Sequence, residues 1–541
     1  MTAIVVKQFG GIKPIASSKL LAANEAQTAQ NARLVSGALL PMKATTTLQA
    51  LASSSPATIF RYGTSSTETN YWLEFSQDTD VMRSPIAADS FDRLYWTNGS
   101  SKPRYAPNNV ILQSGSGAYP RASYELGIPA PTTPLTITTS TPPATNETPE
   151  TRAYLYTYVS AYGEEGPPSP ASTLASVSPN STSVLSIPGG PSGAYNITLK
   201  RIYRASSVGS AAQWQFVAEI PVATGSYTDT KVQASLGEVL PSEDWVGPPA
   251  GLKGLRLMAN GAAVGFVGKT LYFSEPNLPH AWPHEYPIDF DIVGIATYGQ
   301  FVAVLTTSYP YLFQGIDPAA MASSKLPLQQ ACVSKRSIVE TGNGVIYASP
   351  DGLVEIGTTN DVITKALFNR DQWQAYVPSS IDAYQYNGRI HCLYNTGSVR
   401  GTLVFDFTGQ GAVLTTNNVN TTTAVTAGFY DASTDKLYLA QGTNIVRFDH
   451  GSATAYTWKS KVFRLSSPEN LGFGQVVAES YPVTFKLYCE GVLKMTKTVN
   501  NNNQFRLPSG FRAYDWEFQI EGTTEVAEVV LASSTTELKS A

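Results

Sequence analysis

The chain has 541 residues, enough for more than one domain. Only 14% of them are charged, against about 25% in an ordinary soluble domain, while 29 Tyr, 42 Gly and 35 Pro are typical of strands joined by tight turns. The net charge of −4 argues against a protein that grips nucleic acid by neutralising its phosphates. We therefore predict an all-β chain.

Residues 1–50 are expected to form an N-terminal segment with a short helix. Asn24 can cap that helix, and Gln27 completes a capping box three residues later. Ala26 and Ala29 would give the helix a small, flat face suited to close packing. The glycine pair at 10 and 11 permits a chain turn that side chains would block, and Gly37 can end the segment.

Residues 51–127 are predicted to form the first part of a β-propeller. Their β-branched or aromatic runs end in Gly, Ser, Asn or Asp, as strands do. These runs cover residues 58–62, 71–75 and 93–97.

Residues 128–245 are predicted to form an inserted β-sandwich. The run 152–162 alternates in its Tyr residues, and a Gly-Glu-Glu-Gly-Pro-Pro turn closes it. Further strands are expected at 197–204 and 214–220, with no helix pattern between them. The Tyr-rich strand and its turn resemble a fibronectin type III module, and the block is an insertion because the earlier strand style resumes after residue 249.

Residues 246–455 are expected to form the remaining blades of the propeller, although the repeat is too degenerate to give the number of blades. Short strands follow one another here, separated by turns of two or three residues. Residues 456–541 are predicted to form a separate, small C-terminal β domain.

Several motifs along the chain together resemble the podovirus tail nozzle proteins, also called tail tubular protein B. No single motif is specific, but their order is, and together they span nearly the whole chain outside the sandwich. The motifs are Phe9-Gly10-Gly11, Pro14, Leu20, Asn24-Glu25-Ala26-Gln27, Ala29, Asn31, Gly37-x-Leu39-x-Pro41, Leu271-Tyr272-Phe273-Ser274-Glu275-Pro276, Ala281-Trp282-Pro283, Cys332-x-Ser334-Lys335-Arg336-Ser337, Tyr347-Ala348-Ser349-Pro350-Asp351-Gly352-Leu353, Trp458-x-Ser460-Lys461 and Phe505-Arg506-Leu507-Pro508.

The resemblance implies a structural virion protein of a short-tailed bacteriophage. Six copies would form a ring, a homohexamer, at the distal end of the viral tail tube. This nozzle would be a conduit for DNA ejection, passed transiently by genomic double-stranded DNA. Its partners would be a tail adaptor like tail tubular protein A, and tail fibres or spikes; assembly would take place in the host cytoplasm.

The resemblance also suggests a role for the N-terminal segment. Its flat face, with Ala26 and Ala29, would make it a clip against a neighbouring subunit. The alternative is that the segment closes the propeller within its own subunit, and the sequence leaves both interpretations open.

A second hypothesis is a receptor-binding or glycan-cleaving tail protein, with Tyr- and Trp-rich loops as a sugar platform. Glycan cleavage needs two positioned carboxylates, and Glu285, Asp289 and Asp291 lie close in sequence. The Asp-Phe-Asp spacing puts both Asp carboxylates on one face of a strand, which a solvated face or a turn explains equally well.

The His residues do not form a recognisable metal motif. His280 and His284 are four apart, but Pro279 and Pro283 forbid the helix that a zinc site of this spacing requires. The only other His residues are His391 and His450. With no nucleophile elbow, P-loop or dinucleotide fingerprint in the sequence, we expect no enzyme, no cofactor and no catalytic, cofactor-binding or metal-ligating residue.

The three Cys residues, Cys332, Cys392 and Cys489, are odd in number and far apart. They form neither a disulfide framework nor a zinc motif, so buried free thiols are expected. We expect no signal peptide and no membrane span, since no stretch of about 18 apolar residues occurs.

Overall fold

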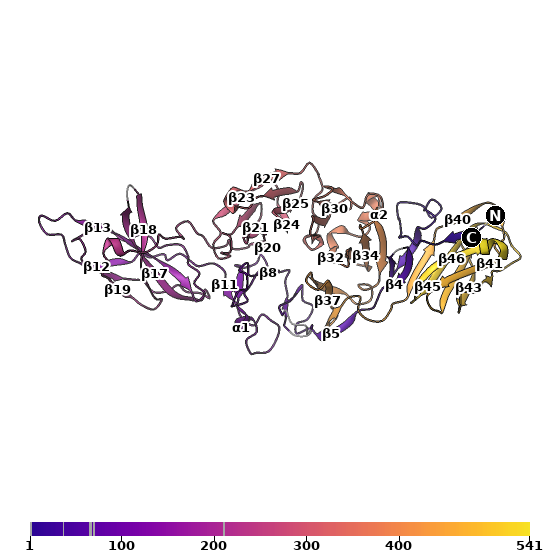
Figure 1. Cartoon of the computed structure of the whole chain (residues 1–541), viewed down its shortest axis with the longest axis horizontal. Helices are drawn as coiled ribbons and strands as arrows, with labels where there is room; N and C mark the ends of the chain where they lie inside the picture. The colour runs from indigo at the N-terminus through magenta and orange to yellow at the C-terminus, as the bar shows by residue number, and fades with distance from the viewer. Residues whose placement is uncertain are drawn as a thin grey trace. The chain divides into compact units, whose positions relative to one another are not determined.

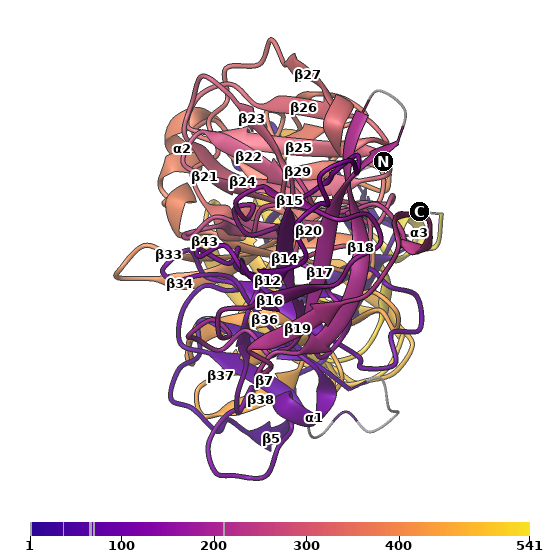
Figure 2. The same cartoon turned by 90° about the vertical axis from the view of Figure 1, so that its left-hand side faces the viewer.

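The computed structural model is nearly all β, with 46% of the residues in strands and 5% in helices, which confirms the predicted all-β class. Figures 1 and 2 show the elements coloured along the chain. The structure describes residues 3–35, 37–63, 68, 71–208, 211–409 and 411–540. The chain divides into unit 1, which comprises residues 1–77, 305–311 and 325–541, and unit 2, which comprises residues 78–304 and 312–324. The predicted domain boundaries divide the chain more finely and stay a prediction.

Groups of four adjacent strands recur along the described chain, and we call each group a blade. In each blade, neighbouring strands are consecutive in sequence, except that the last blade takes its fourth strand from near the start of the chain. All the blades are separate four-stranded sheets except one, which continues into a larger sheet described below. The blades are β8–β11 (Asp80–Arg83, Leu94–Thr97, Arg104–Ala106, Tyr124–Glu125), β20–β23 (Lys253–Leu257, Ala263–Val267, Thr270–Phe273, His284–Pro287), β24–β27 (Ile292–Tyr298, Phe301–Thr306, Tyr311–Gln314, Ala322–Lys325), β28–β31 (Val339–Glu340, Val345–Ala348, Leu353–Ile356, Asp361–Val362), β32–β35 (Asp382–Tyr386, Arg389–Asn395, Arg400–Asp406, Val413–Asn417), and β36–β38 with β5 (Val425–Asp431, Lys436–Gln441, Asn444–Arg447, Thr46–Ala50).

The last blade takes its fourth strand from near the start of the chain. Strand β5 pairs with β38 in the antiparallel sense, with Thr46 opposite Arg447. A two-stranded sheet, β6 (Thr58–Arg61) with β7 (Trp72–Phe75), also belongs to unit 1. Ile59 and Trp72 of this sheet share a buried cluster with Tyr438 of β37, so the sheet packs against the last blade.

Unit 2 contains a β-sandwich in addition to its blades. Two three-stranded sheets share one buried core, to which Tyr154, Tyr156 and Tyr158 contribute alternate side chains of the same strand. Figure 2 shows β14, β17 and β18 side by side. The sheets are β12-β16-β19 (Thr136–Ser140, Ser183–Ser186, Ser226–Asp229) and β14-β17-β18 (Tyr154–Ser160, Ile197–Val208, Ala211–Pro221), with a further pair β13-β15 (Glu150–Arg152, Ala175–Val177).

The N-terminal and C-terminal segments form two sheets together. Strand β1 pairs with β46 of the C-terminal segment, and both ends of the chain lie in this region of unit 1 (Figure 1). One sheet has the order β3-β4-β46-β41-β44, with β1 beside β46; the other joins the β32–β35 blade to β2-β39-β45-β42-β43, with β40 beside β45. The added strands are β1 (Ala3–Val6), β2 (Ala26–Gln30), β3 (Ala32–Val35), β4 (Ala38–Pro41), β39 (Tyr456–Ser460), β40 (Phe463–Glu469), β41 (Phe473–Ala478), β42 (Val483–Cys489), β43 (Val492–Val499), β44 (Phe505–Arg506), β45 (Ala513–Gly522) and β46 (Val526–Ala532).

The prediction of a helix after Asn24 is wrong. These residues form strands β2 and β3, and β2 pairs with β39 on one side and with β35 on the other. Ala26 and Ala29 are each 1% exposed and lie in the chain's own core with Trp458. Because these small side chains face the chain's own core, the structure contradicts the flat contact with a neighbour that the clip requires. Closure of the propeller by this segment stays a prediction.

The glycine pair serves a close approach between backbones. A Cβ on Gly11 would lie 2.4 Å from the carbonyl oxygen of Leu414, and one on Gly10 would lie 2.8 Å from that of Asn24. Gly37, between β3 and β4, has a φ of +86°, which only glycine adopts without strain. The expected turn at Gly37 is therefore present. The pair at 10 and 11 is glycine because any side chain there would collide with a neighbouring backbone segment.

Helices are short in the described chain. None of them is long and apolar enough to cross a membrane. They are α1 (Asn108–Ile111), α2 (Arg370–Gln374), α3 (Thr535–Ser540), and the 3-10 turns Gln233–Ser235, Pro318–Ala320, Lys335–Ser337 and Pro378–Ser380.

Candidate functional site

The three carboxylates considered for glycan cleavage are all exposed. Glu285 lies on β23. Asp289 and Asp291 lie in the bend between β23 and β24 and not on a strand, which agrees with the alternative of a turn. The Lys269 ammonium donates to the backbone oxygen of Asp289 at 3.1 Å. Nothing in their surroundings sets two of these carboxylates apart as an acid and a base.

The two neighbouring His residues have different surroundings. His280 is 4% exposed, and His284 Nε2 lies 3.0 Å from Glu275 Oε1. Residues 279–283 form no helix, as the prolines predict. Within the described ranges, no group of three or more His, Cys, Asp or Glu residues is arranged to hold a metal ion.

The three Cys side chains are free thiols buried in the chain, as expected. Burial raises the pKa of Cys332 and of Cys489 to about 12, and it raises that of Cys392 further. The thiolate is the reactive form, so we expect these thiols to be unreactive in the folded protein.

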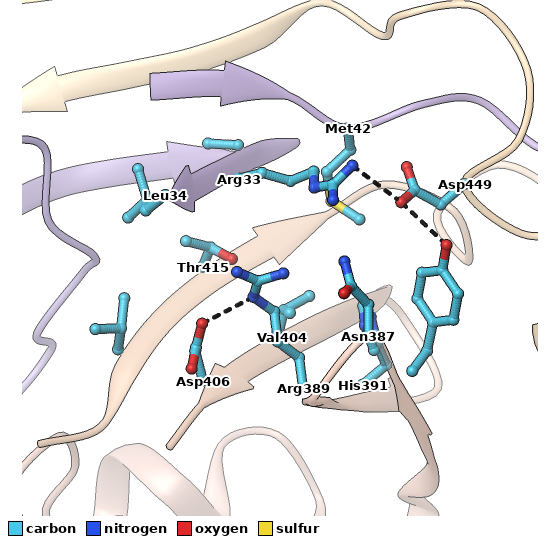
Figure 3. Close-up of a pocket in the computed structure, with 13 residues that line it drawn as sticks. Arg33, Leu34, Met42, Asn387, Arg389, His391, Val404, Asp406, Thr415 and Asp449 are labelled. Carbon is cyan, nitrogen blue, oxygen red and sulfur yellow. Dashed lines mark hydrogen bonds and ion pairs between the residues drawn. The ribbon is translucent and has the colours of Figure 1, made fainter. Parts of the chain in front are cut away.

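A small cavity lies between strand β3 and the β32–β35 blade, and we call it the arginine cavity (Figure 3). It forms because side chains two apart on a strand share a face, which places Arg389 and His391 of β33 on the same side of the sheet. Strand β3 brings Arg33 over that face, and the turn after β32 brings Asn387. The cavity measures about 20 Å³, room for about one water molecule.

Each arginine of the cavity faces one carboxylate. Arg33 Nη1 lies 3.5 Å from Asp449 Oδ2, and Arg389 Nε donates to Asp406 Oδ2 at 3.0 Å. Burial acts to raise the pKa of Asp406, but hydrogen bonds from Thr408 and the charge of Arg389 outweigh it and hold that pKa below its ordinary value. Asp406 is therefore a carboxylate at neutral pH.

His391 forms part of the cavity wall and is 2% exposed. Its ring meets that of Phe448 edge-on, with centroids 5.1 Å apart, and its Nδ1 makes no hydrogen bond. Burial, followed by the positive charge of Arg389, lowers the pKa of His391 to about 3. The ring is therefore neutral near pH 7, and the positive charges of the cavity belong to its arginines.

A second cavity, of about 230 Å³, lies inside unit 2, where the sandwich meets the β8–β11 blade. Arg93 of the blade donates to Glu164 of the sandwich at 2.7 Å and to Asp89 at 2.8 Å. His280 also lines this cavity, and neither of its ring nitrogens has a hydrogen-bond partner. Burial lowers the pKa of His280, which keeps it neutral beside the ion pair. The two charged groups of this ion pair are both buried, and the pair joins the sandwich to the blade.

Sequence reasoning missed both cavities. Arg33 and Arg389 are far apart in the chain, and so are Arg93 and Glu164, so no local pattern joins them. The one available signal was the alternation of Arg389 and His391 along a predicted strand, which places two polar side chains on one face.

No model of a protein family and no curated protein matches the sequence. Similar solved structures include BBS1N in complex with ARL6DN (9% identity, 75% of this chain and 95% of that chain, TM-score 0.28), Hsv2 of Kluyveromyces marxianus (8%, 61% and 95%, TM-score 0.25) and BamB of Moraxella catarrhalis (12%, 59% and 95%, TM-score 0.24). All three are β-propeller proteins. Their TM-scores are too low to carry an argument about this chain.

Proposed function

We propose that the chain is a structural subunit of the tail nozzle of a short-tailed bacteriophage. Six copies form a ring at the distal end of the tail, dock on an adaptor protein and pass double-stranded DNA during ejection. Tail fibres or spikes dock on the ring. The subunit resides in the virion and is not an enzyme. This proposal rests on the ordered motifs of the sequence and on how the fold uses them.

The observation that carries the proposal is that motifs far apart in sequence meet in direct contact. Phe9 packs edge-on against Trp458, with ring centroids 4.9 Å apart, and Trp458 Nε1 donates to the Gly10 carbonyl at 3.0 Å. Two motifs that lie closer in sequence are also in contact, because the backbone N–H of Ala348 donates to Ser337 Oγ at 2.9 Å. Residues shared with the nozzle proteins thus hold together a framework, which is the role that a structural subunit requires of them.

A closed propeller is part of the proposal. The blades follow one another along the chain, and the last of them borrows β5 from near the N-terminus. A strand from the beginning of the chain in the last blade ties the two ends of a series of blades together. Strand β5 pairs with the edge of β38 that the blade would otherwise leave open.

The fibronectin type III-like character of the sandwich is also proposed. Its support is the common core of the two sheets and the Tyr-rich strand β14 within it. The chain leaves for the sandwich and returns at adjacent points, because a Cβ on Gly247 would lie 3.7 Å from the Cα of Gly127. Adjacent ends are what an inserted domain needs.

Antibody labelling of the phage that encodes the chain tests the proposal. Gold-labelled antibody raised against the purified chain should bind at the distal end of the short tail, and averaged images of the tail should show six-fold symmetry there. Label on the capsid or on fibres would contradict the nozzle. Elongated trimers of the purified chain, or turnover of host glycans by it, would instead support a receptor-binding or glycan-cleaving protein.

The isolated chain tests the assembly step. We expect a monomer or a weak oligomer in analytical ultracentrifugation, with the ring forming only on the tail partner. A tight hexamer at low concentration, without partners, would contradict this expectation but not the ring itself.

A further inference from the structure

The arginine cavity presents more hydrogen-bond donors than acceptors. A guanidinium group carries five N–H donors. Arg389 uses its Nε on Asp406, and its two Nη groups make no hydrogen bond to any described residue. Arg33 meets Asp449 through one Nη at 3.5 Å and has no other described partner. Several N–H groups are therefore left for a ligand or for solvent.

The acceptors nearby are already occupied. Asp449 accepts from the backbone N–H of Lys43 at 2.6 Å and from the hydroxyl of Tyr386 at 3.4 Å. Asp406 accepts from the backbone and side chain of Thr408 at 3.0 and 2.6 Å. The carboxylates therefore have little capacity to take up the remaining N–H groups of the arginines.

The remaining donors converge on the empty space. Figure 3 shows the guanidinium groups of Arg33 and Arg389 facing one another across the cavity, with Asn387 beside them. His391 forms part of the cavity wall, and its ring is neutral near pH 7, so the positive charge at the empty space comes from the two arginines.

We propose that the arginine cavity binds a monovalent anion of the size of chloride. The space of about 20 Å³ holds one atom of that size and no complete phosphate or sulfate ion. The charges of Arg33, Arg389, Asp406 and Asp449 cancel, so recognition depends on converging N–H groups, and this favours a single negative charge over a multiple one. The bound anion bridges β3 to the β32–β35 blade.

Bromide is the direct probe, since it replaces chloride and scatters X-rays anomalously. Crystals of the full chain soaked in sodium bromide should show an anomalous peak within hydrogen-bond distance of Arg33 and Arg389. Density for water alone at high bromide concentration would overturn the proposal.

A solution measurement separates specific binding from ionic strength. Thermal melts in sodium chloride and in sodium gluconate at equal ionic strength should differ. The midpoint of unfolding should be about 2 °C higher in chloride when the chloride concentration is ten times the dissociation constant of the site. Arg33→Gln removes a cavity donor at a part-exposed side chain and should abolish the difference. Arg400→Gln is the control, because Arg400 donates to the Thr422 carbonyl and does not line the cavity. This variant should keep the difference between chloride and gluconate.

Three results contradict the site. The difference between chloride and gluconate could persist in Arg33→Gln, it could vanish in Arg400→Gln, or sodium sulfate could stabilise as strongly as chloride at equal ionic strength. If Arg33→Gln does not fold, Arg33→Lys keeps the charge and removes the planar fork, and it should weaken the chloride effect severalfold.

Discussion

Replacing Ala26 and Ala29 together with Leu should destabilise the isolated chain. Both side chains are 1% exposed and lie in the core that joins β2 to the C-terminal strands. A clip between subunits would have left the monomer's stability unchanged. Because both side chains are buried inside the chain, we expect the monomer itself to lose stability.

The magnitude follows from the local geometry. The pairing of β2 with β39 shifts register between Ala26 and Thr28, and this bulge lets two residues three apart in sequence both face the core. Each Leu adds three heavy atoms to a packed core, and overpacking costs about 1–3 kcal/mol at each site. The sites are neighbours and need not be additive, so we expect a loss of about 2–5 kcal/mol, a large part of the roughly 5–15 kcal/mol of a typical domain.

Thermal melts and urea unfolding of the isolated chain measure the effect. Gln30→Leu is the matched control, because it places the same side chain on the same strand at an exposed position. The double variant should melt well below the parent, and the control should melt close to it. A double variant with the parent's midpoint would refute the argument that these side chains are packed inside the chain.

Other predictions concern the sandwich, one histidine and the thiols. Deleting 129–244 and joining the ends with a short Gly-Ser linker should leave the blades folded by circular dichroism, because the chain leaves and returns at adjacent glycines. The pKa of His391 is lowered from 6.5 to about 3, so the unfolded chain binds a proton as the pH falls through 6.5 while the folded chain does not. The stability of the parent relative to His391→Leu should therefore fall by about 2 kcal/mol from pH 7 to pH 5. No thiol should react with a disulfide reagent in the folded protein, and all three should react in denaturant.

Each of these expectations can fail in a defined way. An unfolded spectrum for the deletion would show that the sandwich is part of the core of unit 2. A stability difference that stays constant between pH 7 and pH 5 would mean that His391 takes up a proton in the folded state. One fast-reacting thiol in the native protein would show that its surroundings open in solution.

The composition predicted the strand class because Tyr, Gly and Pro usage reflects many short strands and turns. The same reasoning failed at the N-terminal segment. The spacing Asn-x-x-Gln occurs at Asn24, Asn369 and Asn501, and only the one at Asn369 forms a capped helix, with both capping-box hydrogen bonds present. At the first, pairing with β39 and burial beside Trp458 outweigh the local signal, and nothing near Asn24 in the sequence shows this.

The candidate sites were less predictable than the fold. The exposed carboxylates near residue 289 attracted attention because they are close in sequence, which is the only proximity that a sequence displays. The arginine cavity depends on Arg33 and Arg389, which strand pairing brings together from distant parts of the chain. Such a pair leaves no local pattern.

The place of β2 has a consequence for synthesis. This strand lies between β35 and β39, and β1 pairs with β46, so the partners of these strands are synthesised hundreds of residues later. The N-terminal segment must wait unpaired while hundreds of residues emerge, and contacts of such long sequence separation form slowly. A stalled or truncated chain that lacks β39 would therefore expose Ala26, Ala29 and the edges of β2. Proteases could then cleave the chain at this unpaired segment.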